Sequence, residues 1–374
     1  MAPPPPPDLI DDAIVEILLR LPPDEPEHLF RAALVCKPWL RILCDPAFLR
    51  RYRAYHGDPP LLGLLHRLLL DGDSAPRFAS TTSMPDFPHP GSDGRRTRPL
   101  DCRHGRVLVQ MLDDDESAGY LVWNPVSGDW RAVPELDFDR ATYTAAVFCT
   151  ADGCDHLDCH DGPFHVAFVG SDATWHFLWA SVYSSETGVW STPVSLDNGR
   201  GFHIWPRRAT LVGNEIIEMY FTMTQHTAII GKYIWVKNCL SVVEPPPQAT
   251  NSRWVSLMTM VDGSLGLAGA YDSSLYLWLR KVNSEGAAEW VVCRIIELKT
   301  KIPMENPSDR ASVVGSAEGV GVIFVRTGVG LFIVELKSER VRKVDEPGAY
   351  FSVFPYMNFY TPDRGSLLSL ARAL

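Results

Sequence analysis

The side chains best suited to chemistry lie in one short stretch, residues 149–165. Within these seventeen residues are three cysteines and three histidines, all of types that bind zinc. They are Cys149, Cys154, His156, Cys159, His160 and His165. Successive cysteines are separated by four residues, unlike the C-x2-C pairs of zinc fingers and ribbons. We therefore interpret the stretch as a polar loop between strands, with Gly153 and Gly162 as turn residues, and assign no metal or cofactor.

The rest of the sequence holds no recognisable catalytic arrangement. It has no nucleophile elbow, phosphate loop, dinucleotide fingerprint or H-E-x-x-H helix. Serines and histidines are present, but nothing in the sequence sets a base beside a nucleophile. The acidic run at residues 113–116 lacks the alternating ligands and shaping glycine of a calcium loop, so we interpret it as a solvated turn. We predict no catalysis by this chain.

The amino-acid composition of the chain limits the classes of protein to which it can belong. The chain has 374 residues, of which 46% are hydrophobic and 21% charged, as expected for a globular protein with two or more domains. Its net charge of −10 argues against broad binding to nucleic acid or anionic membranes. The proline-rich start at residues 1–7 has no basic or apolar segment of a secretory signal. Eight scattered cysteines favour a reducing compartment, so we expect a cytoplasmic or nuclear protein.

Residues 8–57 must supply a small helical module. Apolar residues recur at helical spacing in a first helix that ends at Pro22 and Pro23, and in a second that begins near Pro26. The two stripes are Ile14, Ile17, Leu18 and Leu21, then Leu29, Ala32, Ala33 and Cys36. Pro38 and the Asp45–Pro46 pair predict the starts of a third and a fourth helix. These apolar residues are too many for one side of small helices, so the remaining chain or a partner must cover them.

This module resembles an F-box. The resemblance is carried by Leu9, Asp11, Asp12, residues 16–22, residues 34–37, Trp39 and residues 45–48. The sequence departs from the family pattern at Ile10, where a proline is usual, and at Pro38. The resemblance implies docking onto a Skp-family adaptor and through it onto a cullin. The residues we expect to dock are Leu9, Ile14, Ile17, Leu18, Leu21, Pro22, Leu29, Val35, Cys36, Trp39 and Leu40. Some of these must also hold the helices together, and the sequence does not divide the two roles.

From about residue 100 the pattern changes to short β-rich runs. A unit of strand, polar turn and strand recurs at residues 121–134, 180–193, 234–245, 277–298 and 332–347, each preceded by a further β-rich segment. A period of roughly 50 to 60 residues with two hairpins per repeat predicts a β-propeller. We count five repeats and expect a sixth from residues 60–90 joined to the strands around residues 351–360. A curved β-sandwich of irregular hairpins is the alternative. We expect most tryptophans of the repeats to pack between blades.

The β-rich region resembles the F-box-associated, kelch-like domain of plant F-box proteins. The resemblance is carried by residues 101–108, 122–130, 151–164 and 180–191. The predicted fold class is therefore α+β multidomain, a helical F-box followed by an all-β, propeller-like domain. The predicted segments are 1–7 (proline-rich leader), 8–57 (F-box), 58–99 (linker and first β elements), 100–362 (β-domain) and 363–374 (tail).

The two resemblances together imply the substrate-recognition subunit of a ubiquitin ligase, which is an adaptor without catalytic activity. Of the long loops, residues 197–208 offer aromatic and guanidinium groups typical of interface hot spots. The residues we expect to contact a target protein are Arg200, Phe202, His203, Trp205 and Arg207. Two alternatives remain: a propeller that is an enzyme or binds glycans, and a scaffold that binds targets without degrading them. The enzyme alternative predicts convergent carboxylates or histidines at the channel of the ring.

Overall fold

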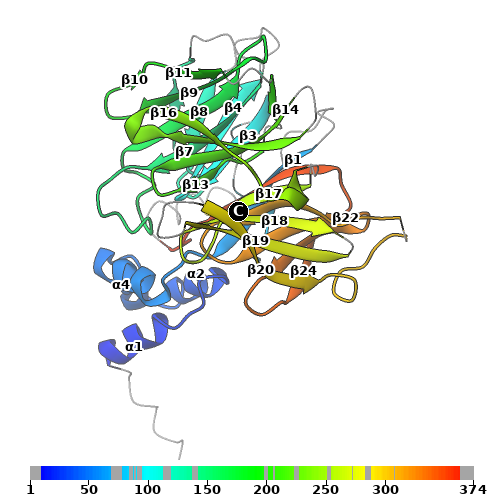
Figure 1. The fold of residues 1–374 in the computed structure, drawn as a ribbon. Coiled ribbons are helices and arrows are strands. Elements are labelled where there is room, and N and C mark those ends of the chain that lie inside the picture. Colours follow the sequence, from blue (N-terminus) through cyan, green and yellow to red (C-terminus); the bar gives the residue numbers. More distant parts are fainter. Residues whose placement is uncertain are drawn as a thin grey trace, which may run out of the picture.

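The computed structural model has four N-terminal helices followed by a ring of six β-sheets (Figure 1). The structure describes residues 10–68, 78–83, 87, 90, 95–112, 119–136, 142–197, 201–204, 207–222, 227–250, 254–271, 273–282, 288–306 and 308–362. The proline-rich leader, the acidic run, the tail and part of the predicted linker segment lie outside these residues. No helix in the described part of the chain has the length and apolarity to cross a bilayer.

The helices of the N-terminal module begin or end near the prolines of the sequence, as predicted. Its helices are α1 (Asp11–Leu18), α2 (Glu27–Ala33), α3 (Lys37–Leu43) and α4 (Pro46–His56). Asp45 accepts a hydrogen bond from the Ala47 amide at 2.6 Å, which caps α4 as predicted. One detail of the predicted stripes is wrong: Cys36 lies beyond the end of α2 and is exposed, because the helix ends at Ala33.

Five of the six sheets form in chain order, and each corresponds to one predicted repeat. Sheet 1 contains β3 (Arg96–Arg103), β4 (Arg106–Leu112), β5 (Tyr120–Trp123) and β6 (Trp130–Val133). Sheet 2 contains β7 (Thr142–Cys149), β8 (Phe164–Ser171), β9 (Phe177–Ser184), β10 (Val189–Trp190) and β11 (Val194–Asp197). Sheet 3 contains β12 (Phe202–Ile204), β13 (Thr210–Val212), β14 (Glu215–Thr222), β15 (Ala228–Ile234) and β16 (Cys239–Val243). Two short 3-10 helices, Trp235–Lys237 and Pro247–Ala249, flank β16.

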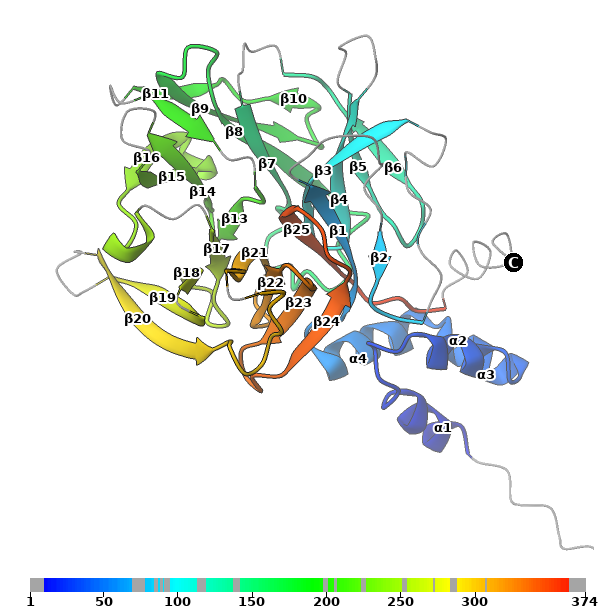
Figure 2. The same cartoon turned by 90° about the vertical axis from the view of Figure 1, so that its right-hand side faces the viewer.

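The remaining sheets complete the ring (Figure 2). Sheet 4 contains β17 (Val255–Thr259), β18 (Leu265–Tyr271), β19 (Ser274–Val282) and β20 (Ala288–Glu297). Sheet 5 contains β21 (Ser312–Ala317), β22 (Val322–Thr327), β23 (Gly330–Glu335) and β24 (Val341–Asp345). Sheet 6 joins β1 (Leu61–Leu68) and β2 (Ala79–Ser80) to β25 (Tyr350–Met357) from the other end of the chain. The fold is therefore a six-bladed propeller, and the six sheets are called blades 1 to 6 below.

Blade 6 closes the ring. Its strand order is β2-β1-β25, and β1 runs antiparallel to β25 from the pair Leu61 and Met357 to the pair Leu68 and Tyr350. β25 also packs against β21 of blade 5 and β3 of blade 1, so it is the innermost strand of its blade. This pairing confirms the prediction that strands from both ends form the sixth repeat. Closure covers the inner strands of blades 5 and 1, β21 and β3, which would otherwise lie open where the ring ends.

The turn in the repeated unit requires a left-handed residue. In blades 1 and 2 this position is a glycine, Gly128 (φ 78°) and Gly188 (φ 73°), whose amide donates to a carbonyl four residues earlier. In blades 3 and 5 the left-handed residues are Asn238 (φ 46°) and Glu339 (φ 54°). The Asn238 amide donates to a carbonyl only three residues earlier, that of Trp235, so this turn differs from those of blades 1 and 2. The weaker sequence match of these later repeats thus reflects a change of residue type at the left-handed position.

Tryptophans connect neighbouring blades, as expected, in two of the repeats. The indole N–H of Trp190 donates to the Pro134 carbonyl at 3.1 Å, and that of Trp290 donates to the Glu244 carbonyl at 2.9 Å. Each bond runs from an outer strand to the end of the preceding blade. Trp130 does not follow this pattern, because its side chain is 60% exposed.

The helical module packs directly on the propeller. Phe30 of α2 contacts Tyr360 with ring centroids 4.9 Å apart and belongs to the apolar cluster of blades 6 and 1. Phe359 belongs in turn to the core of the helical module, where it meets Tyr52. Leu157, from the loop between β7 and β8, packs on the same core. In both views α1 is the helix farthest from the propeller (Figures 1 and 2).

Candidate functional site

The helical module exposes apolar side chains that the propeller does not cover. Ile17 of α1 is 48% exposed, and Leu34 and Val35, in the turn after α2, are 79% and 63% exposed. Cys36 in the same turn is also exposed, and so is Ile10 directly before α1. Large aliphatic groups left in water on a small module indicate a partner surface. We call Ile17, Leu34, Val35 and Cys36 the exposed apolar edge.

Three of the predicted docking residues lie inside the module instead. Ile14, Leu18 and Leu29 are 8%, 1% and 1% exposed and form its core with Leu43 and Tyr52. They stabilise the helices and cannot contact a partner directly. Leu18 and Ile17 are neighbours in the sequence, and the structure buries the first and exposes the second.

Four further predicted docking residues have an intermediate solvent exposure. Leu21, Trp39 and Leu40 are half-buried and pack on the outside of the helical core, while Pro22 is half-buried in the turn after α1. Leu9 lies outside the described residues. The predicted set therefore divides into a core group, a half-buried group and the exposed Ile17, Val35 and Cys36. Leu34 belongs to the exposed apolar edge but was not among the predicted docking residues, because it lies off the predicted apolar stripe of the second helix.

A network of charged side chains crosses the centre of the ring. Arg103 of β3 donates to both carboxylate oxygens of Glu318, at 2.8 and 2.7 Å, and also pairs with Asp101. Arg208, between β12 and β13, pairs with Asp101 at 3.1 Å and with Glu318 at 3.2 Å. The four residues come from blades 1, 3 and 5, which are not adjacent, so their contacts must span the channel.

This network joins the blades and neutralises its own carboxylates. Burial opposes ionisation of Glu318, but Arg103 and Arg208 outweigh it and lower the pKa of that carboxyl to about 2. The Asp101 oxygen that pairs with Arg103 also accepts the Val147 amide of blade 2 at 2.8 Å. The enzyme alternative predicts convergent carboxylates at the channel. Asp101 and Glu318 do converge there, but each of them forms ion pairs with both Arg103 and Arg208.

Another carboxyl, Glu218 of β14, is 3% exposed, and burial raises its pKa well above the ordinary value. One of its oxygens accepts the Met219 amide at 3.0 Å. Burial also lowers the pKa of the nearby Arg207 to about 10. The guanidinium of Arg207 donates to the Val255 carbonyl at 2.7 Å and lies over the rings of Trp254 and Phe351. These internal contacts argue against the predicted role of Arg207 in target capture.

The other predicted target-binding residues are not placed by the structure. Arg200 and Trp205 lie outside the described residues. Phe202 and His203 belong to β12, which pairs with β14, but their side chains are not described. Their role stays a prediction.

The cysteine- and histidine-rich stretch forms the loop between β7 and β8, as predicted. Its folding was not predicted. The ligand atoms of Cys149, Cys154, His156 and Cys159 all lie within 4.8 Å of one another. His160 and His165 are not members of this group. No sequence motif signalled the convergence, because the spacing follows no familiar zinc-binding pattern.

Comparison with known families agrees with this architecture. The family described as "F-box domain" matches residues 7–51, and the family described as "F-box protein AT5G49610-like, beta-propeller" matches residues 99–363. The second match covers more than half of the chain. The chain belongs to this family of F-box proteins. The F-box of these proteins is an adaptor module, and with the β-propeller it supports a general role as a substrate receptor. The match leaves the kelch-like character a prediction.

Other comparisons are more distant. No curated protein sequence matches the chain. Among solved structures, an alpha-L-arabinofuranosidase of Fusarium graminearum shares 12% identity over 71% of this chain and 86% of that chain, with a TM-score of 0.39. A mutant of AofleA from Arthrobotrys oligospora shares 11% identity over 68% and 72%, with a TM-score of 0.40. A match to a prolyl endopeptidase has 13% identity, 70% coverage of this chain and a TM-score of 0.35. This F-box protein spans about a third of that enzyme, of which 36% is covered. No activity is taken from these similarities.

Proposed function

We propose that this F-box protein is the substrate-recognition subunit of a Skp–cullin–F-box ubiquitin ligase. The observation that carries the proposal is the exposed apolar edge of the F-box. One side of the helical module is covered by residues 359–362 and the loop at residues 157–158, whereas Ile17, Leu34 and Val35 remain in water. F-box domains generally bind Skp-family adaptors, and an uncovered apolar surface is what such an adaptor would bury.

The mechanism is tethering. The adaptor would hold the F-box on a cullin, and the propeller would hold a target protein, so that target lysines are concentrated near the ubiquitin-charged enzyme. The chain itself would carry out no chemistry, which agrees with the pairing of Asp101 and Glu318 to arginines in the channel. Direct packing of the F-box on the propeller supports this mechanism, because a fixed geometry keeps the target at a defined place.

Two further parts of the proposal concern the target and the compartment. Propeller loops are free to vary while strands hold the fold, so we propose target capture by the loop at residues 197–208, through Arg200, Phe202, His203 and Trp205.

We also propose that the protein acts in the cytoplasm or nucleus, because all eight cysteines are free thiols.

The test is reconstitution of the full chain with a purified Skp-family adaptor. We expect a one-to-one complex in size-exclusion chromatography and its incorporation into a cullin complex that ubiquitinates co-purifying proteins. A folded chain, checked by circular dichroism, that fails to bind any Skp-family adaptor would contradict the proposal. Adaptor binding without a change in the half-life of captured proteins would instead favour the non-degradative scaffold.

A further inference from the structure

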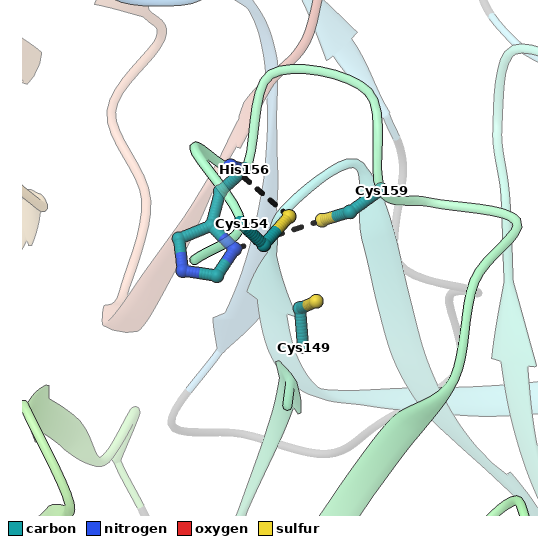
Figure 3. Close-up of side chains that lie close together, drawn as sticks. All are labelled: Cys149, Cys154, His156 and Cys159. Carbon is teal, nitrogen blue, oxygen red and sulfur yellow. Dashed lines mark hydrogen bonds between the residues drawn. The ribbon is translucent and has the colours of Figure 1, made fainter. Parts of the chain in front are cut away.

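Four side chains in the loop between β7 and β8 are arranged as the ligand set of a metal ion. Cys149 is the last residue of β7, and Cys154, His156 and Cys159 follow in the loop (Figure 3). The sulfur atoms of Cys154 and Cys159 face one another, with that of Cys149 close by and the His156 ring at their side. The Cys159 Sγ to His156 Nδ1 distance is 3.7 Å. In a tetrahedral zinc site that edge measures about 3.6 Å, given Zn–S and Zn–N bonds of about 2.3 and 2.05 Å.

Each of the three sulfurs also receives one N–H donor. The Ala151 amide donates to the Cys149 sulfur and the His156 amide to the Cys154 sulfur, both at 3.4 Å. The Arg106 guanidinium lies 3.8 Å from the Cys159 sulfur. N–H donors of this kind commonly hydrogen-bond the ligands of a metal site and hold them in orientation.

Arg106 is a buried charge that has no acidic partner among the described residues. It is 1% exposed, and its guanidinium donates to the carbonyls of Cys159 and Gly162. A buried cation normally requires a compensating anion. Three thiolates, one neutral histidine and a divalent cation carry a net charge of −1, so Arg106 would balance the loaded site.

His104, in the turn between β3 and β4, packs against the fourth ligand, His156. His104 stacks on His156 with ring centroids 4.0 Å apart and planes 6° from parallel. The Nδ1 atom of His104 accepts the Cys149 amide at 3.1 Å, which orients the His104 ring and leaves its proton on Nε2. The stacking on His104 fixes the plane of the His156 ring beside the sulfurs.

We propose that Cys149, Cys154, His156 and Cys159 bind one zinc ion in a structural Cys3His site. Three thiolates and an imidazole in tetrahedral reach select Zn2+ over Mg2+ or Ca2+, which prefer oxygen ligands. Four protein ligands leave no open coordination position, so the site stabilises structure and does not activate water. The exposed edge of His156 provides the route by which the ion enters.

The position of the site indicates which part of the structure a bound zinc ion would stabilise. The same loop carries Leu157, which packs in the F-box core, and Asp158, which pairs with Arg53 of α4. Zinc would therefore order the segment that joins the F-box to blades 1 and 2. In hydrogen–deuterium exchange we expect residues 150–163 and α4 of the full chain to exchange more slowly with zinc than after chelation.

The test begins with the metal content of the full chain, purified with a reductant and analysed by mass spectrometry for metals. We expect about one zinc per chain. Replacement of zinc by Co2+ should produce the visible bands of tetrahedral cobalt together with a thiolate charge-transfer band. Cys154→Ser and Cys159→Ser should lose most of the metal, whereas Cys239→Ser and Cys293→Ser, at exposed cysteines of blades 3 and 4, should retain it. His156→Cys should retain Co2+ with a stronger charge-transfer band.

Three results would overturn the proposal. The first is wild-type protein that takes up neither Zn2+ nor Co2+ under reducing conditions, a measurement that needs no variant to fold. The second is wild-type metal content in both Cys154→Ser and Cys159→Ser. The third is an intact mass showing a disulfide among these cysteines in protein kept reduced, since this pairing would remove two of the ligands.

Discussion

Arg53 in the last helix of the F-box forms an ion pair with Asp158 in the loop between β7 and β8. The two residues lie 105 positions apart in the sequence and belong to different domains. The Arg53 side chain is 12% exposed and that of Asp158 is 48% exposed, so water screens the pair only in part. Together with the contacts of Phe30 and Phe359, the pair makes the F-box and the propeller one packed unit.

The exposed apolar edge should tolerate charge in the free protein but not in the complex. Val35→Asp is expected to weaken adaptor binding at least tenfold, about 1.4 kcal/mol, because it sets a carboxylate into an apolar contact. Its melting temperature should match that of the wild type. The matched control is Val282→Asp in blade 4, since Val282 is also 63% exposed. Calorimetric titration with the adaptor measures the effect, and equal affinities for the two variants would contradict the assignment.

Truncation of the neighbouring residues Leu18 and Ile17 of α1 should change the free energy of unfolding by different amounts. Leu18→Ala is expected to reduce the free energy of unfolding by about 2–5 kcal/mol, because Leu18 is 1% exposed in the helical core. Ile17→Ala should change it little, because Ile17 is 48% exposed. Urea unfolding of the full chain, followed by a probe in the helical module, makes the comparison. Similar losses for both variants would show that α1 is rotated relative to the structure.

Because β25 closes the ring, substitutions in its buried residues should strongly reduce the stability of the fold. Phe354→Ala should cost about 3–5 kcal/mol, because Phe354 is 1% exposed and packs with Phe30, Tyr356 and Tyr360. Phe177→Ala in β9 is the control, since that phenylalanine is 40% exposed. Thermal and denaturant unfolding should separate the variants clearly. If Phe354→Ala proved as stable as Phe177→Ala, β25 would not close the ring.

The channel network predicts a dependence of stability on pH. The pKa of Glu318 is about 2, below its ordinary value of 4.5, so the ionised carboxylate stabilises the fold. This contribution is complete above about pH 4.5 and is lost as the pH falls toward 2. Glu318→Gln should cost about 3–5 kcal/mol at neutral pH, since it leaves Arg103 and Arg208 without one partner. The difference in melting temperature between wild type and variant should narrow on acidification.

Glu339→Gln is the control for Glu318→Gln, because Glu339 pairs with Arg294 and Lys301 at the surface. We expect a small change of melting temperature in that variant at every pH. A Glu318→Gln variant with the same small change would mean that the network does not hold the blades together.

The sequence predicted much of the fold because the repeated unit is a local pattern. A hydrophobic strand, a polar turn and a second strand identify the outer hairpin of a blade, and four of the five predicted units fall on such hairpins. The unit at residues 234–245 contains the second strand of its hairpin, but residues 235–237 form a 3-10 helix and only Ile234 belongs to β15. The pairing of β1 with β25 followed from the need to close the ring. Where the turn residue changes from glycine, as at Asn238 and Glu339, the sequence pattern weakens although the residue keeps a positive φ.

The parts that escaped prediction depend on contacts between distant segments. Helical spacing groups Ile17 with Leu18, and only the packing of α1 on the other helices separates the exposed residue from the buried one. Arg103 and Glu318 are 215 positions apart, so no local pattern could pair them. The convergence of Cys149, Cys154, His156 and Cys159 depends on the path of one loop, which their spacing alone does not determine.

The closing strand also governs when the two domains can fold during synthesis. On the ribosome the F-box helices are made before Phe359 of their core and β25 of the ring. N-terminal domains commonly fold before the rest of the nascent chain. Here neither domain can complete its core until β25 and Phe359 have been made. A chain that stopped before β25 would therefore lack both a closed ring and a finished F-box core.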